Sequence, residues 1–583
     1  MIKKWILNPL AEDEKSRNSI KKLSQELNIS TPLAKLLVQR GIDDFNKAKK
    51  FFRPQLKDIH DPFLMNDMDK AVERLNKAMQ NKEKILIYGD YDVDGTSAVA
   101  LVYKFLNQFY AELDYYIPDR YAEGYGISYT GIDYAAENGF TLVIALDCGI
   151  KAVEKVAYAK EKGVDFIICD HHTPDDKLPD AVAVLDQKRE DSTYPYGHLS
   201  GCGVGFKLMQ AFAIKNGIAF EELIHLLDLL SISIASDIVP ITGENRILAH
   251  YGLKQLNSKP SVGINAMIDI CELRGKDITI SDIVFKIGPR INASGRIRSG
   301  KDAVDLMITK DHETASLWSS RINKYNQERK NLDKKITEEA KVLVNDDYLK
   351  AHKSIVVYDK TWSKGVIGIV ASRLTEKYYR PSIVLTTSED KENEDDDTLI
   401  TGSARSIPGF DIYKAIDSCR DLLENFGGHI YAAGLSLKRK NLDNFMERFE
   451  NFVASNLESE QQVPIIEIDT EITLDQITNK FYKILKQFEP FGPDNMKPVF
   501  CTRNLHDAGG SRAVGKNQEH EKIEVVDKLT GVTLNGIAFG QSEWNDYIKQ
   551  GNPIDICYTL EENTFNGTTS IQLMIRDIQK SKI

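Results

Sequence analysis

The chain has 583 residues, a formal net charge of −11, and a composition that is 42% hydrophobic and 28% charged. This length predicts three to five domains at roughly 150 residues each, and the composition excludes a disordered, collagen-like or low-complexity protein. No stretch is long and apolar enough to span a bilayer, and no signal peptide fits the start, so we expect a cytoplasmic protein without a membrane partner. The cysteines are scattered and none forms a CxxC pair, which argues against a disulfide framework or a thiolate zinc site.

The first 80 residues are predicted to be helical and connecting structure, with helical apolar spacing at 32–40 and 68–79. From 81 to 310, short apolar runs alternate with helical patterns. The runs lie at 85–88, 114–117, 142–146, 166–169 and 181–185, and the helical patterns include 96–109, 153–162, 204–213 and 221–235. Near-continuous apolar strands that alternate with helices predict a parallel, doubly wound α/β sheet covered on both faces.

A long polar helix is predicted at 311–346, where a narrow apolar stripe runs along a charged rod, and we interpret it as a spacer between two lobes. A smaller α/β region at 347–462 follows, and its acidic run at 389–397 is expected to be a solvated loop. Short strands dominate 463–583. They predict a small antiparallel barrel of the oligonucleotide-binding type, although a sandwich fits nearly as well.

Three carboxylates follow the first predicted strand, in the segment GDYDVDGTSA at 89–98. Asp90, Asp92 and Asp94 are expected to alternate along an extended or turning segment before a helix begins. Carboxylates this close repel one another unless a cation neutralises them. An EF-hand loop is excluded, because its twelfth position, counted from Asp90, is Leu101 and not glutamate.

Two more predicted strands end in the same way. Asp147 follows one strand, and Asp170, His171 and His172 follow the next. The carboxyl ends of parallel strands line the ligand crevice of an open sheet, so these groups should meet. Carboxylates with imidazole suit manganese or magnesium. Asp237, after an apolar helix, is either a helix terminator or a further ligand that would complete a two-metal site.

The motifs GDYDVDGTSA, LDCG, DHHTP and ASDIVP, in this order, resemble the DHH phosphoesterase superfamily, and within it the RecJ-type single-strand exonucleases. The resemblance extends from about residue 40 to near the end through GPRINASGRI (288–297), SKGVIGIVASRL (363–374), GSARS (402–406), FGGHIYAAG (426–434) and PFGPDN (490–495). It implies a multidomain α/β protein: an N-terminal helical segment packed on a parallel-sheet DHH lobe, a linking helix, a smaller α/β DHH-associated lobe and a C-terminal β-barrel that is an oligonucleotide-binding domain.

The resemblance implies two divalent ions, Mn²⁺ or Mg²⁺, with Asp147 best placed as a bridging ligand. It implies metal ligation by Asp92, Asp94, Asp147, His171 and Asp237, with Asp90, Asp170 and His172 in or near the coordination sphere. The catalytic residues implied are Asp92, Asp94, Asp147, His171 and His172.

Basic residues are concentrated at 286–301, which holds five and no acid, although a solvated basic face is the usual reading of such a run. Arginines among small residues suit close phosphate recognition instead. In RecJ-type proteins the GSARS segment and the arginine of DRYAEGYG resemble the pocket for the 5′-terminal phosphate, which implies Arg120, Ser403 and Arg405. The substrate-binding residues expected here are Arg120, Arg290, Asn292, Arg296, Ser403, Arg405 and His429.

The leading hypothesis is a metal-dependent 5′-to-3′ exonuclease of single-stranded DNA in DNA repair and recombination, which uses activated water without a covalent intermediate. The partners expected are single-stranded DNA with a 5′ end, a helicase and a single-strand-binding protein, and we expect a monomer. A DHH phosphodiesterase of oligonucleotides or cyclic dinucleotides is the alternative enzyme, but it needs no strand-holding barrel. A non-catalytic DNA-binding scaffold would require lost metal ligands, and a calcium-binding structural protein is weaker still.

Overall fold

The computed structural model describes residues 3–9, 13–388, 395–565 and 567–581. Contacts divide the chain into two compact units. We call one the parallel-sheet unit, formed by Trp5–Tyr116, Gly126–Gly288 and Ile465–Ile583, and the other the long-helix unit, formed mainly by Ile117–Tyr125 and Pro289–Pro464. No helix in the described part of the chain has the length and apolar character needed to cross a membrane.

The parallel-sheet unit contains a five-stranded sheet in the order β3-β2-β4-β5-β6, and every pairing in it is parallel. Its strands are β2 (Lys84–Gly89), β3 (Leu113–Tyr116), β4 (Phe140–Leu146), β5 (Asp165–Cys169) and β6 (Ala183–Leu185). The predicted parallel α/β sheet is therefore confirmed. Its central strands are buried on both faces, which explains why they read as continuous apolar runs.

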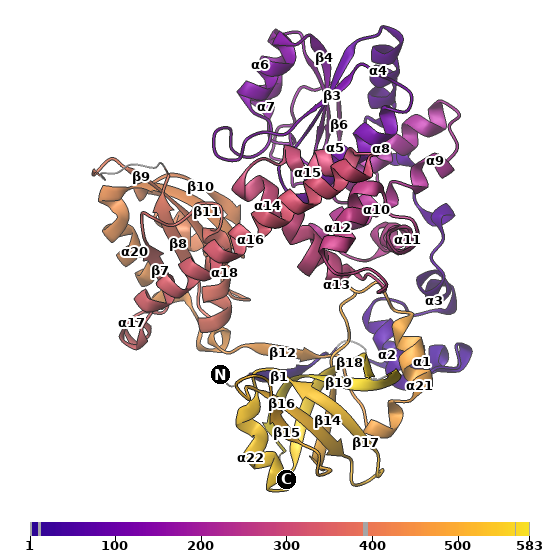
Figure 1. Ribbon diagram of the computed structural model, residues 1–583, viewed down its shortest axis with the longest axis vertical. Helices are drawn as coiled ribbons and strands as arrows, with labels where there is room; N and C mark the ends of the chain where they lie inside the picture. Colours follow the sequence, from indigo (N-terminus) through magenta and orange to yellow (C-terminus); the bar gives the residue numbers. More distant parts are fainter. Residues whose placement is uncertain (1–2, 10–12, 389–394, 566, 582–583) are drawn as a thin grey trace. The chain divides into compact units, whose positions relative to one another are not determined.

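Helices cover both faces of this sheet, as Figure 1 shows. On one face Leu86 and Tyr88 pack with Ile132 of α6 (Tyr129–Glu137) and Val156 of α7 (Val153–Glu161). The other face carries α4 (Met68–Gln80), α5 (Val93–Leu106) and α8 (Gly201–Lys215). Beyond these, α10 (Leu227–Ser236) packs against α5, α8 and α11 (Gly243–Ser258). Buried helices thus surround the carboxyl edge of the sheet.

The C-terminal strands form a closed barrel and not a sandwich. The pairing runs β14-β18-β19-β17-β16, and β16 pairs again with β14. The strands are β14 (Phe500–Asp507), β16 (His520–Val526), β17 (Thr533–Ala538), β18 (Ile554–Phe565) and β19 (Thr568–Lys580). The expected all-antiparallel pattern is wrong in one place within the ring: β17 pairs with β19 in parallel, because β18 lies between them in the chain and reverses direction once more.

The N-terminal helices α1 (Glu14–Glu26), α2 (Thr31–Gln39) and α3 (Phe45–Phe52) belong with the barrel. Leu23 and Leu37 share one hydrophobic core with Phe488 and Phe500. This differs from the expected packing of the whole segment 1–80 on the DHH lobe, where the short turns Leu56–Asp58 and Pro62–Leu64 and helix α4 pack on α11 and α8. The apolar faces of α1 and α2 are buried by the barrel, and helical periodicity alone does not reveal the partner.

The long-helix unit contains α16 (His312–Leu343) and a mixed sheet in the order β10-β11-β9-β8-β7. The strands are β7 (Ile355–Tyr358), β8 (Ser382–Thr387), β9 (Leu399–Arg405), β10 (Leu423–His429) and β11 (Ala432–Lys438). Helix α18 (Ile367–Tyr378) packs on β8, β9 and α16. The predicted long helix and second α/β region are both present, and most of the predicted acidic loop, 389–394, lies outside the described residues.

The remaining helices are α9 (Glu221–Ile224), α12 (Val262–Ile270), α13 (Ile280–Asp282), α14 (Gly288–Ile297), α15 (Lys301–Ile308), α17 (Asp346–Ala351), α19 (Ile412–Asp417), α20 (Leu442–Asn456), α21 (Asn479–Lys486) and α22 (Asn545–Lys549), with a π-helical turn at Ile283–Ile287. The remaining strands are β1 (Lys4–Leu7), β12 (Ile465–Ile468), β13 (Thr470–Glu471) and β15 (Arg512–Val514).

Candidate functional site

The first acidic motif turns sharply from strand β2 into helix α5. The helix begins at Val93, with Asp92 as its N-cap: the Asp92 carboxylate accepts a 3.0 Å hydrogen bond from the Gly95 backbone. Asp94 therefore lies in the first helical turn. The expected extended or turning segment contains Asp90 and Asp92, but the helix begins before Asp94 and not after it. The turn is so tight that a Cβ at Gly95 would lie 2.5 Å from the carbonyl oxygen of Asp90. Glycine fits here because it has no Cβ.

The ring of His171 lies among three carboxylates. Its Nε2 is 3.2 Å from Asp147 Oδ1, 3.6 Å from Asp237 Oδ2 and 3.8 Å from Asp94 Oδ2. This nitrogen is buried and makes no hydrogen bond to any residue that the structure describes. A buried imidazole nitrogen aimed at several carboxylates without a hydrogen bond is an arrangement that a divalent cation would satisfy.

The ligand atoms that converge here form two overlapping groups. One joins Asp147, His171 and His172, the other Asp94, His171 and Asp237, and within each group the atoms lie within 4.8 Å of one another. Among the described residues, neither group includes Asp90, Asp92 or Asp170, three of the expected metal ligands. They are nonetheless buried beside the site or form its supporting turns.

Asp94 is fixed by the N-terminus of α8. Its carboxylate accepts hydrogen bonds from the backbone of Gly201 at 2.6 Å and of Cys202 at 2.8 Å, and from Ser233 Oγ at 2.7 Å. A helix N-terminus favours negative charge, so it stabilises the ionised carboxylate that a metal needs. We did not single out Gly201 or Ser233 from the sequence, although the serine- and glycine-rich start of α8 is a cap signal that could have drawn attention to them.

Asp170 orients the histidine pair. Its Oδ1 accepts a 2.7 Å hydrogen bond from His172 Nδ1, and its Oδ2 accepts a 2.9 Å hydrogen bond from the Ile150 backbone. Burial alone would raise the pKa of Asp170, but the hydrogen bond and the charge of His172 outweigh burial and lower the pKa to about 2. With Nδ1 held in this way, Nε2 is the nitrogen of His172 that remains for a metal or a substrate, a common arrangement for histidines at metal sites.

The carboxylates of the cluster repel one another. Burial, followed by the charges of Asp94 and Asp92, raises the pKa of Asp237 to about 9. Burial and the same neighbouring carboxylates raise the pKa of Asp147 well above its ordinary value. A bound cation would reverse these shifts, because it favours the ionised form of each ligand. The donor set of carboxylates and imidazole therefore fits divalent metal ions.

The end of β6 follows the same rule as the other strands, and we missed it in the sequence. Asp186 comes directly after this strand and is fully buried. Its Oδ1 accepts a 2.6 Å hydrogen bond from the Lys188 backbone, and its Oδ2 has no hydrogen-bond partner. Burial raises the pKa of Asp186 to about 7, and the nearby charge of Asp170 adds to the shift.

The long-helix unit brings predicted substrate-binding residues together. One terminal nitrogen of Arg405 donates to Ser403 Oγ at 3.0 Å, and Arg296 donates to the Gly365 carbonyl at 3.0 Å. A Cβ at Gly368 would lie 2.9 Å from Ser403 Oγ and 3.1 Å from the other terminal nitrogen of Arg405, so this glycine keeps space beside both. Burial, followed by the positive charges of Arg120, Arg329 and Arg405, lowers the pKa of Arg296 to about 10.

The other residues that we predicted to bind substrate do not form a cluster with Arg405 and Ser403. Arg290 Nε donates a 3.0 Å hydrogen bond to Asn323 Oδ1, and Asn292 Oδ1 is buried without a hydrogen-bond partner. His429 lies exposed at the end of β10. Within the residues that the structure describes, it forms no hydrogen bond or ion pair with the arginines.

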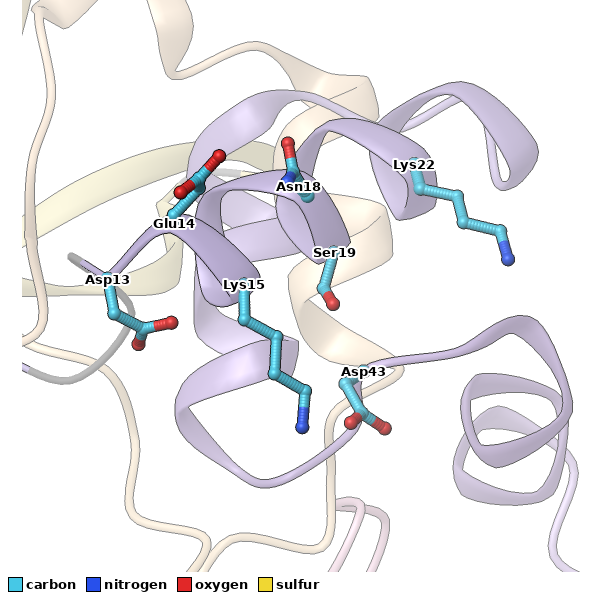
Figure 2. Close-up of a pocket in the computed structure, with 7 residues that line it drawn as sticks. All are labelled: Asp13, Glu14, Lys15, Asn18, Ser19, Lys22 and Asp43. Atoms are coloured by element: carbon cyan, nitrogen blue, oxygen red, sulfur yellow. The ribbon is translucent and has the colours of Figure 1, made fainter.

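The N-terminal helices carry a polar depression that is unrelated to this chemistry. Figure 2 shows it lined by side chains of α1 and by Asp13 and Asp43. Asp13 caps α1 through a 2.9 Å hydrogen bond from the Ser16 backbone. None of the predicted metal or substrate residues lines this depression, so it is an open polar surface and not the site.

Comparison with known proteins decides the family. The sequence profile of the DHH family N-terminal domain matches residues 84–234, that of the DHHA1 domain matches 351–455, and that of the RecJ OB domain matches 468–577. The single-stranded-DNA-specific exonuclease RecJ of Bacillus subtilis is 36% identical over 571 residues, which cover 97% of this chain and 70% of that protein. The chain belongs to the RecJ family.

A second relative supports this assignment, and a solved structure shows the same fold. RecJ of Haemophilus influenzae is 32% identical over 90% of this chain and 92% of its own length. The crystal structure of Thermus thermophilus RecJ in complex with Mn²⁺ superposes with a TM-score of 0.83, covering 100% of this chain and 80% of that chain at 23% identity. This RecJ-family chain thus combines the DHH, DHHA1 and RecJ OB domains in one fold.

Proposed function

We propose that this RecJ-family chain is a metal-dependent exonuclease that removes nucleotides from the 5′ end of single-stranded DNA. The observation that carries the proposal is the buried Nε2 of His171, which faces Asp94, Asp147 and Asp237 and makes no hydrogen bond. The names of the relatives, single-stranded-DNA-specific exonuclease, agree with it. Repair and recombination are the processes in which we place it, with a helicase and a single-strand-binding protein as partners.

Two divalent ions, Mn²⁺ or Mg²⁺, would be held by Asp94, Asp147, His171 and Asp237, with Asp92 and His172 beside them. When bound, such ions polarise the scissile phosphate, activate water and neutralise the leaving oxygen. Asp94, Asp147 and His171 are all buried, whereas the side chains of Asp237 and His172 are partly exposed and leave the site open to water and substrate. Asp94 accepts a hydrogen bond from the first turn of α8, and Asp147 faces His171 at 3.2 Å.

His172 is the residue that we propose holds and moves a proton. Burial opposes its charged form, but the hydrogen bond from its Nδ1 to Asp170 outweighs burial and raises its pKa. Asp170 thus favours the charged form of the ring, in which Nε2 can donate a proton to the leaving 3′ oxygen. Asp170 keeps the ring in the required orientation and tautomer.

The arginines of the long-helix unit would bind the 5′-terminal phosphate. Arg405 and Ser403 offer a guanidinium and a hydroxyl to one side of the space that Gly368 keeps open, and Arg120 and Arg296 add charge. A planar guanidinium suits a phosphate through two charge-assisted hydrogen bonds. Recognition of the terminus, together with the barrel that would hold the strand, favours an exonuclease over a phosphodiesterase of very small substrates.

The test uses labelled single strands, duplexes and dinucleotides of matched sequence, incubated with Mn²⁺, Mg²⁺ or a chelator. We expect release of nucleotides from the 5′ end of single strands with either metal, little cleavage of blunt duplex, and none with chelator. Release from the 3′ end would contradict the proposed polarity. Dinucleotides cleaved faster than long single strands would favour the small-substrate phosphodiesterase.

A further inference from the structure

One face of helix α16 carries residues that orient arginines. Asn323 Oδ1 accepts a 3.0 Å hydrogen bond from Arg290 Nε. One turn further, Asn326 Oδ1 accepts from both Nε and a terminal nitrogen of Arg329, at 3.2 and 3.1 Å. The two asparagines are three positions apart, so they share a helix face and lie about 4.5 Å apart along its axis.

The next orienting residue on this helix is an acid. Asp333 binds Arg373 of α18 through two hydrogen bonds, of 2.7 and 2.6 Å, and is itself buried. This bidentate ion pair ties α16 to α18 and neutralises Arg373. Asp333 and Arg373 therefore join these two helices.

Asn326 orients Arg329 without neutralising it, unlike Asp333, which neutralises Arg373. An amide oxygen fixes the direction of the guanidinium fork but leaves its positive charge uncompensated, whereas a carboxylate would cancel the charge. Asn326 is buried and Arg329 is half-buried, so the geometry is fixed at the cost of partly desolvating a cation. Arg329 forms no ion pair within the described part of the chain, although Asp333, already engaged by Arg373, lies nearby.

Arg329 also lies near several other arginines, which carry the same positive charge. It adds to the positive potential at Arg296, which Arg120 and Arg405 raise as well. Burial lowers the pKa of Arg329 itself. The charge of Asp333 opposes this effect, but the charges of Arg373 and Arg290 add to it, and the net shift is downward. Positive groups held this close, in partly buried positions and on neutral hydrogen-bond acceptors, are stabilised when an anion binds among them.

We propose that Arg329, oriented by Asn326 on α16, forms a second phosphate subsite that binds an internucleotide phosphate of the DNA strand, beyond the 5′-terminal phosphate. This inference rests on the proposed function and adds a ligand to it. The long helix is then part of the DNA-binding surface and not only a spacer between lobes.

The test is binding of a 5′-phosphorylated single strand by the full chain in chelator, so that no cleavage occurs. Arg329→Gln should weaken binding roughly ten-fold, the loss expected for one charge-assisted contact, and should reduce the slope of log affinity against log salt by about 0.7. The matched control is Arg321→Gln, which removes the same charge from the same helix; Arg321 is exposed and stacks over Trp318. It should leave affinity nearly unchanged.

A neutral methylphosphonate moved along the internal linkages locates the contact. In wild type, one position should weaken binding strongly, and at that position Arg329→Gln should cause no further loss. Asn326→Asp, which keeps an oxygen acceptor but cancels the charge, should reproduce Arg329→Gln, and the melting temperature checks that both variants fold. The proposal would be overturned if Arg329→Gln weakened DNA binding no more than Arg321→Gln does. It would also be overturned if Arg329→Gln caused the same additional loss of affinity at every linkage.

The outcome separates this inference from the proposed function. The preference for 5′-phosphate over 5′-hydroxyl ends should be the same in wild type and in Arg329→Gln, because the terminal phosphate is assigned to Arg405. If that preference is lost only in Arg329→Gln, the residue binds the terminus and the second subsite is wrong. If wild type shows no preference and releases no 5′ nucleotides with metal, the proposed function fails, whatever the methylphosphonate scan shows.

Discussion

The backbone N–H of Gly201 donates a 2.6 Å hydrogen bond to Asp94, and a Cβ on Gly201 would lie 2.5 Å from Oδ1 of Asp147. The first turn of α8 therefore touches two carboxylates of the candidate metal site from different strands. Only a glycine permits this approach. The spacing of the site is thus set by the backbone of a helix that contributes no ligand side chain of its own.

Gly201→Ala should displace Asp147, because the new Cβ would lie 2.5 Å from the Cβ and 2.7 Å from the backbone Cα of Asp147. The backbone at Asp147 must move as well as its side chain, so the melting temperature in chelator should fall in this variant. A displacement of about 1 Å at a reacting centre costs roughly a hundred-fold in rate, and Mn²⁺ affinity should fall as well. The matched control is Gly203→Ala, whose Cβ would meet Leu199 at 3.3 Å. Equal activities of the two variants would show that contact with Asp147 is unimportant.

Asp170→Asn tests the orientation of His172. The variant keeps an oxygen acceptor for Nδ1 but loses the charge that raises the pKa of His172. We expect kcat to fall about ten- to a hundred-fold with a small change in KM. The alkaline side of the pH profile should move to lower pH, because His172 loses the proton that it donates at a lower pH. A fall in metal affinity alone, with kcat restored at saturating Mn²⁺, would instead make Asp170 a metal ligand.

Asp186 should make the metal-free protein less stable as pH rises. Its folded pKa of about 7 lies above its ordinary value of 3.8, so the folded state binds the extra proton, and the stability that this provides is lost as pH rises through 7. Between pH 6 and pH 8 the loss is about 1.4 kcal/mol. Asp186→Asn should remove this part of the pH dependence. Thermal melts in chelator at both pH values check it, and identical slopes in wild type and variant would contradict the buried, protonated carboxyl.

Arg405→Lys should weaken the preference for 5′-phosphorylated over 5′-hydroxyl single strands. Lysine keeps the charge but cannot form the two-pronged contact, so the preference should fall by roughly ten- to a hundred-fold, with Mn²⁺ affinity unchanged. The measurement is kcat/KM on the two kinds of end. An equal fall on both would mean that Arg405 only supports the lobe through Ser403 and the Ala404 carbonyl.

The parts that follow from local sequence pattern were predictable. Apolar runs with a periodicity suited to buried strands gave the parallel sheet, and Asp147 and His171 were expected at its carboxyl edge because parallel strands end together. The long helix, predicted at 311–346, spans His312–Leu343. Each of these depends on residues close together in the chain.

Features that depend on tertiary contacts were not predictable. The apolar face of α2 requires a partner, but nothing in its periodicity says that the partner is the barrel, 400 residues later and not the DHH lobe. Asp170 was expected to bind metal, yet its oxygens are occupied by His172 and the Ile150 backbone. Truncation of the barrel is therefore a poor test of DNA binding, because it would also expose the core of α1 and α2.

The measurement that tests the account most directly is Mn²⁺ binding and 5′-nucleotide release, made on the same preparations of wild type and Asp147→Ala. Asp147 Oδ1 lies 3.2 Å from His171 Nε2, at the centre of the cluster. We predict that the variant keeps its melting temperature in chelator and its affinity for single-stranded DNA. It should lose tight Mn²⁺ binding, and its rate of nucleotide release should fall at least about a thousand-fold, on the order expected when a metal ligand is removed. Near-normal release by Asp147→Ala would contradict a metal-dependent exonuclease centred on this site.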